Sequence, residues 1–301
     1  MTNSFPNVNP PHDTINAMQT DTMPNKPIGI FDSGVGGLSV LRVIRELLPA
    51  EHILYLADQA HIPYGPRQKE EIRAFAYGIT KFLLGQDAKL IVVACNTASA
   101  AALHDLRSDF PEIPFVGMEP AVKPAAAQTQ TGRVGVLATP TTFAGEMYHA
   151  LVDRFAKGIQ IYQNTCPGLV EQIERGEFDS PATREILEAA LHPMLEENVD
   201  TVVLGCTHYP FVIPLIQDIT GPNIHTIDPS PAIARQTQRV LNEHNWLNPA
   251  KTFGALNFFT SGDAIGLSRV LPHLLGEARP VSPVKWNNFS LETPFRANHP
   301  E

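Results

Sequence analysis

The clearest candidate for chemistry in the first half of the chain is a cysteine, Cys95, at the end of an apolar run. Cys95 follows the run 90–94 and precedes Asn96 and Thr97, where a helical pattern begins. The positive field of a helix N-terminus lowers the pKa of a thiol, and a neighbouring base such as Asp32 would help further. Because a free thiol is only a few per cent thiolate at neutral pH, such help would make Cys95 a competent base.

A second cysteine, Cys206, occurs in the same context in the later part of the chain. It follows the apolar run 201–204 and precedes Thr207 and His208. A histidine two residues from a strand-end cysteine can tune the thiol or carry a proton. No further Cys/His set converges on it, so zinc is not expected. Two thiols in matching contexts suit one reaction in particular, the removal of a proton from one face of a carbon and the return of one to the other face.

A glycine-rich turn, DSGVGG at 32–37, separates the apolar run 28–31 from the helical pattern 38–48. Glycines let the backbone turn tightly and expose N–H groups at a helix N-terminus, where carboxylates bind well. The turn fits neither the dinucleotide fingerprint nor the Walker pattern. Since the carboxylate of Asp32 would repel an anion, Asp32 is expected to orient or deprotonate a neighbour, with helix capping as the alternative.

The elements that would hold these residues alternate between apolar, β-branched runs and amphipathic helical patterns. The runs lie at 28–31, 53–56, 90–94, 134–137, 159–162, 201–204 and 224–227. Helical patterns cover 38–48, 68–84, 98–110, 183–197 and 232–242. This alternation predicts an α/β fold with mostly parallel sheets, in which ligands lie at the carboxyl ends of the strands. A weak repeat between the two halves predicts two similar domains that face one cleft.

Composition limits the partners. The chain has 301 residues and a formal net charge of -9, which disfavours nucleic acid and anionic membranes. Its three cysteines are too few for a disulfide framework. No apolar run is long enough for a membrane helix, and residues 1–26 lack the features of a signal peptide. We therefore expect a cytoplasmic protein with a disordered extension at 1–26.

Taken together, the motifs resemble those of the glutamate racemases, within the wider aspartate/glutamate racemase group. The matching stretches are IGIFDSGVGGLSV (28–40), IPYG (62–65), VVACNTASA (92–100), VGMEPAVKPA (116–125), VGVLATPTT (134–142) and VVLGCTHYP (202–210). They spread from residue 27 to about residue 240, which is most of the chain. The resemblance implies an isomerase that works without pyridoxal phosphate, any other cofactor or a metal, and that supplies D-glutamate for peptidoglycan.

The same resemblance implies roles for individual residues. In relatives the cysteine matched by Cys95 takes the proton from D-glutamate, and the one matched by Cys206 takes it from L-glutamate. Asp32 matches the acid that assists the first cysteine, and His208 matches the one that assists the second. Positions that hold the substrate are matched by Asp32, Ser33, Tyr64, Gly65, Asn96, Thr97, Thr142, Thr207 and His208.

One further catalytic position is left open between two residues. The family has a glutamate that helps the second cysteine, in a stretch that aligns without a gap with 166–178. The alignment puts Glu174 in this role, but the middle of the stretch departs from the family pattern, so Glu171 stays an alternative. Cys166, which begins the stretch, then looks structural.

The fold implied is a pair of pseudo-symmetric, doubly wound α/β domains with the active-site cleft between them. The first domain would comprise 27–119 plus 230–275 and the second 120–229, with a C-terminal tail at 276–301. Relatives usually form dimers. Some carry an extension like 1–26 and are activated by UDP-N-acetylmuramoyl-alanine, so a homodimer and this activator are expected.

Other functions stay open on the sequence alone. A racemase of the same group could act on aspartate or a hydantoin, since one methylene is discriminated by only about 1–3 kcal/mol. A cysteine-dependent hydrolase or amidase would use one nucleophilic cysteine and leave the other without purpose. A non-catalytic amino-acid-binding protein would have no need for the paired cysteines.

Overall fold

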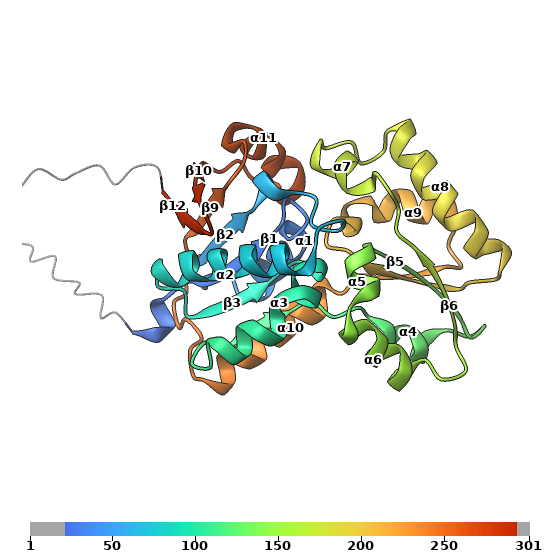
Figure 1. Ribbon diagram of the computed structural model, residues 1–301, viewed down its shortest axis with the longest axis horizontal. Helices are drawn as coiled ribbons and strands as arrows, with labels where there is room; N and C mark the ends of the chain where they lie inside the picture. The colour runs from blue at the N-terminus through green and yellow to red at the C-terminus, as the bar shows by residue number, and fades with distance from the viewer. Residues whose placement is uncertain (1–21, 294–301) are drawn as a thin grey trace, which may run out of the picture.

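Parallel strands form the first sheet of the computed structural model, which describes residues 22–293 (Figure 1). The strands follow the order β10-β9-β2-β1-β3-β4. Their bounds are β1 (Ile28–Asp32), β2 (Ile53–Ala57), β3 (Leu90–Val93), β4 (Phe115–Gly117), β9 (Leu256–Thr260) and β10 (Val281–Pro283). Every residue of β1, β2 and β3 is buried, which is typical of parallel strands covered on both faces.

Helices cover both faces of this sheet, as the alternation of side chains along β1 requires. Ile28 and Ile30 belong to the hydrophobic cluster that includes side chains of α1 and α10, whereas Phe31 packs with α2 and α3. The helices of this half are α1 (Leu38–Leu47), α2 (Lys69–Gly85), α3 (Asn96–Asp109), α10 (Ser230–Glu243) and α11 (Ala264–Leu275), with the 3₁₀ helices η1 (Met23–Asn25) and η2 (Gln59–His61).

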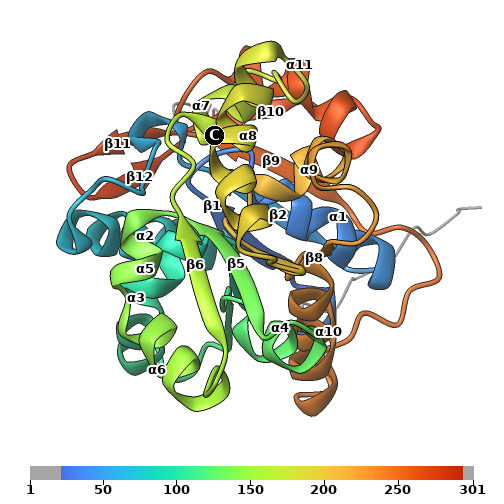
Figure 2. The same ribbon diagram turned by 90° about the vertical axis from the view of Figure 1, so that its right-hand side faces the viewer.

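The second sheet is also parallel, in the order β6-β5-β7-β8, and Figure 2 shows it from its outer side. Its strands are β5 (Arg133–Ala138), β6 (Gln160–Asn164), β7 (Thr201–Gly205) and β8 (His225–Ile227). The helices are α4 (Val122–Gln128), α5 (Pro140–Ala144), α6 (Glu146–Phe155), α7 (Leu169–Glu174), α8 (Pro181–Glu196) and α9 (Ile213–Thr220), with the 3₁₀ helix η3 (Tyr209–Val212). Val136 packs with α4 and α6, whereas Leu137 packs with α8 and α9, so this sheet too is covered on both faces.

These two sheets confirm the predicted α/β class with mostly parallel strands, and each predicted run contains or overlaps a strand. The strands β4, β9 and β10 were not predicted, nor was the antiparallel hairpin of β11 (Lys285–Asn287) and β12 (Ser290–Glu292). The predicted domain boundaries stay a prediction. Within the described residues, no helix is long and apolar enough to cross a membrane.

The ends of the described chain are packed against the first sheet. Residues 1–21 of the predicted extension and 294–301 of the predicted tail lie outside the described residues. The rest of the predicted extension holds the 3₁₀ helix η1, and Lys89 Nζ donates to Pro24 O in it at 2.8 Å. At the other end, β10 joins the first sheet beside β9.

A buried ion pair joins Lys89 and Glu51 in the part of the structure that contains the first sheet. Lys89 Nζ lies 2.6 Å from Glu51 Oε2, and the two side chains are 0% and 2% exposed. Removing one partner of a buried pair strands the other charge and costs about 3–5 kcal/mol. We therefore expect Lys89→Met to lower the free energy of unfolding by about that amount, measured by urea denaturation. Adding Glu51→Gln should recover part of the loss, and a double variant less stable than Lys89→Met would contradict this account.

Candidate active site

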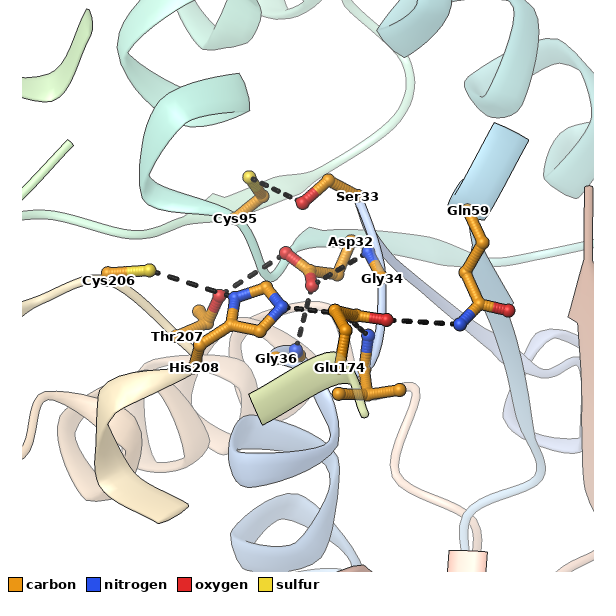
Figure 3. A network of polar contacts seen from close by, with 12 residues as sticks. Asp32, Ser33, Gly34, Gly36, Gln59, Cys95, Glu174, Cys206, Thr207 and His208 are labelled. Carbon is orange, nitrogen blue, oxygen red and sulfur yellow. Dashed lines mark hydrogen bonds and ion pairs between the residues drawn. The ribbon is translucent and has the colours of Figure 1, made fainter. Parts of the chain in front are cut away.

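Cys95 lies where the sequence placed it, between strand β3 and helix α3. It is the N-cap of α3, and its Sγ accepts a hydrogen bond from Ala98 N at 3.4 Å. The side chain is buried, and Sγ lies 4.0 Å from Ser33 Oγ, which follows β1 (Figure 3). Cys95 is therefore held by two strand ends of the first sheet.

The charge state of Cys95 differs from the sequence-based expectation. Burial raises the pKa of this thiol well above its ordinary value, and the nearby carboxylate of Asp32 raises it further. The N–H of Ala98 at the helix N-terminus acts in the expected direction but is outweighed. Because desolvation of a thiolate costs more than one backbone dipole returns, this environment favours the protonated form of Cys95.

Cys206 begins a chain of polar contacts in the second half. Its Sγ lies 3.7 Å from His208 Nδ1, and His208 Nε2 lies 2.7 Å from Glu174 Oε1 (Figure 3). Glu174 also accepts hydrogen bonds from Val35 N at 2.7 Å and from Gln59 Nε2 at 3.1 Å. The carboxylate at the end of α7 thus fixes the imidazole beside the sulfur.

The electrostatics of these polar contacts favour a charged His208. Burial lowers the pKa of His208, but its hydrogen bonds with Cys206 and Glu174 outweigh burial and hold that pKa well above the ordinary value. Burial raises the pKa of Glu174, but the hydrogen bond and charge of His208 reverse the shift and leave it lowered. An imidazolium beside Cys206 stabilises negative charge on that sulfur.

Asp32 joins the two halves. Its Oδ2 accepts hydrogen bonds from Gly34 N at 3.1 Å and Gly37 N at 3.0 Å, and its Oδ1 accepts from Thr207 Oγ1 at 3.3 Å. The side chain is fully buried, and burial raises its pKa despite the opposing charge of His208. Asp32 therefore stabilises the glycine-rich turn and also reaches the strand end that carries Cys206; it is not the N-cap of α1, which is Gly37.

A cavity of about 240 Å³ lies between the strand ends, and both Cys95 and Cys206 line it. Its wall also contains most of the predicted substrate contacts, namely Ser33, Tyr64, Gly65, Asn96, Thr97, Thr207 and His208. Asn96 is 2% exposed, and neither atom of its side-chain amide has a hydrogen-bond partner within the described structure. A buried amide left unpaired at a cavity wall is suited to bind a polar ligand.

Three residues proposed from the sequence lie behind the wall. Asp32, Glu174 and Thr142 are not among the lining residues, and each touches one that is. Thr142 Oγ1 lies 2.9 Å from Thr139 Oγ1, which lines the cavity in its place. Sequence reasoning missed Thr139, although its position directly after β5 matches that of Cys95 after β3 and was the available signal.

The structure separates the two glutamates that the sequence left open. Glu174 at the end of α7 contacts His208, whereas Glu171, one helical turn earlier, lines the cavity. To accept a hydrogen bond from the imidazole of His208, a carboxylate must lie beside it. The geometry therefore favours Glu174 for the contact with His208.

Two thiols at the ends of parallel strands, one from each sheet, line one cavity, an arrangement suited to an α/β enzyme of the racemase class. The chain belongs to the Asp/Glu/Hydantoin racemase family, whose model matches residues 28–237. A curated glutamate racemase from Ectopseudomonas mendocina is 52% identical over 257 residues, which cover 85% of this chain and 97% of that relative.

Solved structures agree with this assignment. The glutamate racemase of Francisella tularensis in complex with D-glutamate is 31% identical, with a TM-score of 0.76, and the match covers 87% of this chain and 98% of that one. The Escherichia coli glutamate racemase, in complex with L-glutamate and the activator UDP-MurNAc-ala, is 35% identical, with a TM-score of 0.75, and the match covers 86% and 97% of the two chains.

Proposed function

We propose that this chain interconverts L- and D-glutamate by proton transfer between Cys95 and Cys206 and needs no cofactor. The observation that carries the proposal is that the two thiols line the same cavity. The relatives, which are glutamate racemases, support glutamate as the substrate. The D-glutamate formed would serve peptidoglycan synthesis in the cytoplasm.

In the L-to-D direction, the thiolate of Cys206 removes the α-proton while the thiol of Cys95 delivers a proton to the opposite face. His208, held charged by Glu174, stabilises Cys206 in its thiolate form. Negative charge grows on the α-carboxylate as the proton leaves, and preorganised donors at that place lower the barrier. Asn96 is suited to this task because it lines the cavity with an amide that has no partner within the described residues, whereas the hydroxyl of Thr207, which also lines the cavity, donates to Asp32.

Each turnover leaves the two sulfurs with exchanged protonation states. One proton has moved to Cys206 and one has left Cys95, so the next turnover in the same direction requires the reverse exchange. The carboxylate of Asp32 acts on the Cys95 thiol, and His208 contacts Cys206, so these two side chains stand beside the sulfurs whose protonation states must be restored before the next turnover. In the D-to-L direction the two cysteines exchange roles.

The proposal is tested with purified protein and L-glutamate in D₂O, with no added cofactor. We expect optical rotation to decay as deuterium enters the α-position, and a parallel run with L-aspartate to be much slower. Equal rates with aspartate would contradict the assignment of glutamate as the specific substrate. No decay with either amino acid would overturn the racemase function. An acyl-enzyme detected by mass spectrometry would support the hydrolase alternative instead.

The unpaired side-chain amide of Asn96 gives a separate prediction. We expect Asn96→Ala to raise the KM for glutamate about tenfold, the value of one lost hydrogen bond, to lower kcat as well because a donor to the growing charge is lost, and to leave the protein equally or more stable, because an unpaired buried amide is removed. Steady-state kinetics and a thermal melt measure these effects. A lower melting temperature together with an unchanged KM would show that Asn96 is structural.

We also propose that UDP-MurNAc-ala activates the enzyme and that the protein is a homodimer. The complex of the Escherichia coli relative, 35% identical to this chain, with that activator supports the first point. Racemisation rates with and without the nucleotide test activation, and an unchanged rate would remove it. Light scattering after gel filtration tests the dimer, and a monomer mass would remove that proposal.

A further inference from the structure

A buried carboxylate behind the cavity, Asp58, connects the C-terminal segment to the active-site wall. Asp58 is 0% exposed. Its Oδ2 accepts a hydrogen bond from Tyr64 OH at 2.6 Å and lies 2.9 Å from His61 Nδ1. Its Oδ1 accepts from Ser261 Oγ at 2.6 Å and from Trp286 Nε1 at 2.7 Å. One oxygen therefore faces the cavity wall, and the other faces the C-terminal elements.

Tyr64 is the member of this group that lines the cavity. Burial raises its pKa well above the ordinary value, and the charge of Asp58 raises it further, so the phenol keeps its proton and donates a hydrogen bond to Asp58. The ring also packs against Phe75, in the same hydrophobic cluster as Cys95. The position of this part of the wall thus depends on where Asp58 is held.

Trp286 lies on strand β11 of the C-terminal hairpin, far from Asp58 in sequence. Its indole contacts the rings of His61 and Phe75, with centroids 5.2 and 5.7 Å away, and the His61 and Phe75 rings stack at 3.8 Å. The hairpin packs closely on α2. A Cβ atom placed at Gly78 of α2 would lie only 2.5 Å from Phe289 O, between the two strands of the hairpin. The hairpin is therefore a fixed support for Asp58.

The neighbouring residue makes a parallel connection to the other side of the site. Gln59 Oε1 accepts from Thr260 Oγ1 at 2.9 Å, and Gln59 Nε2 donates to Glu174. The end of β9 thus holds Asp58 through Ser261 and Gln59 through Thr260. Both contacts anchor the segment that precedes Tyr64.

We propose that Trp286 and Asp58 are positioning residues, through which the C-terminal hairpin fixes the Tyr64 wall of the cavity. This inference rests on the proposed racemase function for its kinetic consequence only. The mechanical link from the hairpin to Tyr64 stands apart from the substrate. No reacting atom touches either residue, so their effect must reach the reaction through Tyr64.

The test uses Trp286→Phe, which removes the indole N–H and keeps an aromatic ring in place. The chain offers a matched control in its other tryptophan, Trp246, which contacts His244 away from the cavity. We expect Trp286→Phe to raise the KM for glutamate about three- to tenfold, as expected for one lost hydrogen bond to a carboxylate, and Trp246→Phe to leave it unchanged. Tyr64→Phe should raise it at least as much, and the double variant should be no worse than Tyr64→Phe.

Hydrogen exchange gives a readout that does not depend on activity. We expect faster amide exchange across residues 58–65 in Trp286→Phe than in the wild type, with no change in Trp246→Phe. If the wild type fails to racemise glutamate while this difference is present, the proposed function falls and the positioning link stands. If exchange is unchanged, or if the kinetic effects of Trp286→Phe and Tyr64→Phe simply add, the positioning link is overturned.

Discussion

Cys95→Ala and Cys206→Ala are each expected to abolish measurable racemisation. A positioned acid or base contributes about 10²–10⁴-fold to a rate, and each variant removes one of the two groups that the reaction needs on opposite faces of the carbon. The enantiomers have equal free energies in water, so kcat/KM must fall by the same factor in both directions. The loss is measured as the rate of optical decay from each enantiomer.

The two variants should differ in proton exchange, although both fail to racemise. Cys95→Ala keeps the thiol that faces the α-proton of L-glutamate, so slow deuterium uptake is expected into L-glutamate and not into D-glutamate. Cys206→Ala should show the opposite preference. Uptake into both enantiomers by either variant would mean that one group serves both faces, which contradicts a two-base mechanism.

Cys166→Ala is the matched control for these substitutions. Cys166 is buried and lines the same cavity, and burial raises its pKa to about 12. Because it has no proton-transfer role in the proposed mechanism, we expect this variant to keep most of its activity. Complete loss of racemisation with an unchanged melting temperature would show that Cys166 takes part in the chemistry.

The sequence predicted seven of the described strands and the strand-end location of the two cysteines because parallel topology follows from local patterns. Runs such as 90–94 and 201–204 are apolar throughout, and the polar residues that follow them must lie at one edge of a sheet. Contacts such as Trp286 with Asp58 join residues 228 positions apart, and no local pattern encodes them. The hairpin and strands β9 and β10 escaped prediction for the same reason.

The charge of Cys95 shows a second limit of sequence reasoning. The helix N-terminus was visible in the sequence and predicted a lowered pKa. The depth of burial and the carboxylate of Asp32 depend on the packing of both halves, and they reverse the sign. The choice between Glu171 and Glu174 was open for a similar reason, since it depends on how α7 is rotated about its axis against His208.

The second large effect is expected for His208→Asn. This variant removes the cation beside Cys206, and we expect kcat/KM to fall by about 10²-fold, the lower end for a group that assists proton transfer. Glu174→Gln should have a smaller effect in the same direction. The hydrogen bond from His208 to Glu174 is one of the interactions that raise the pKa of the imidazole, so without the carboxylate His208 loses its proton at a lower pH.

The pH dependence then follows with a definite sign. The folded-state pKa of His208 lies above its ordinary value of 6.5, so the charged form adds stability that is complete below about 6.5 and is lost as the pH rises through the folded-state pKa. Glu174→Gln should move the basic limb of kcat/KM to lower pH and remove part of this stability at acidic pH. Rate profiles and melting temperatures across the pH range measure both. A basic limb that stays in place in Glu174→Gln would mean that a group other than His208 controls it.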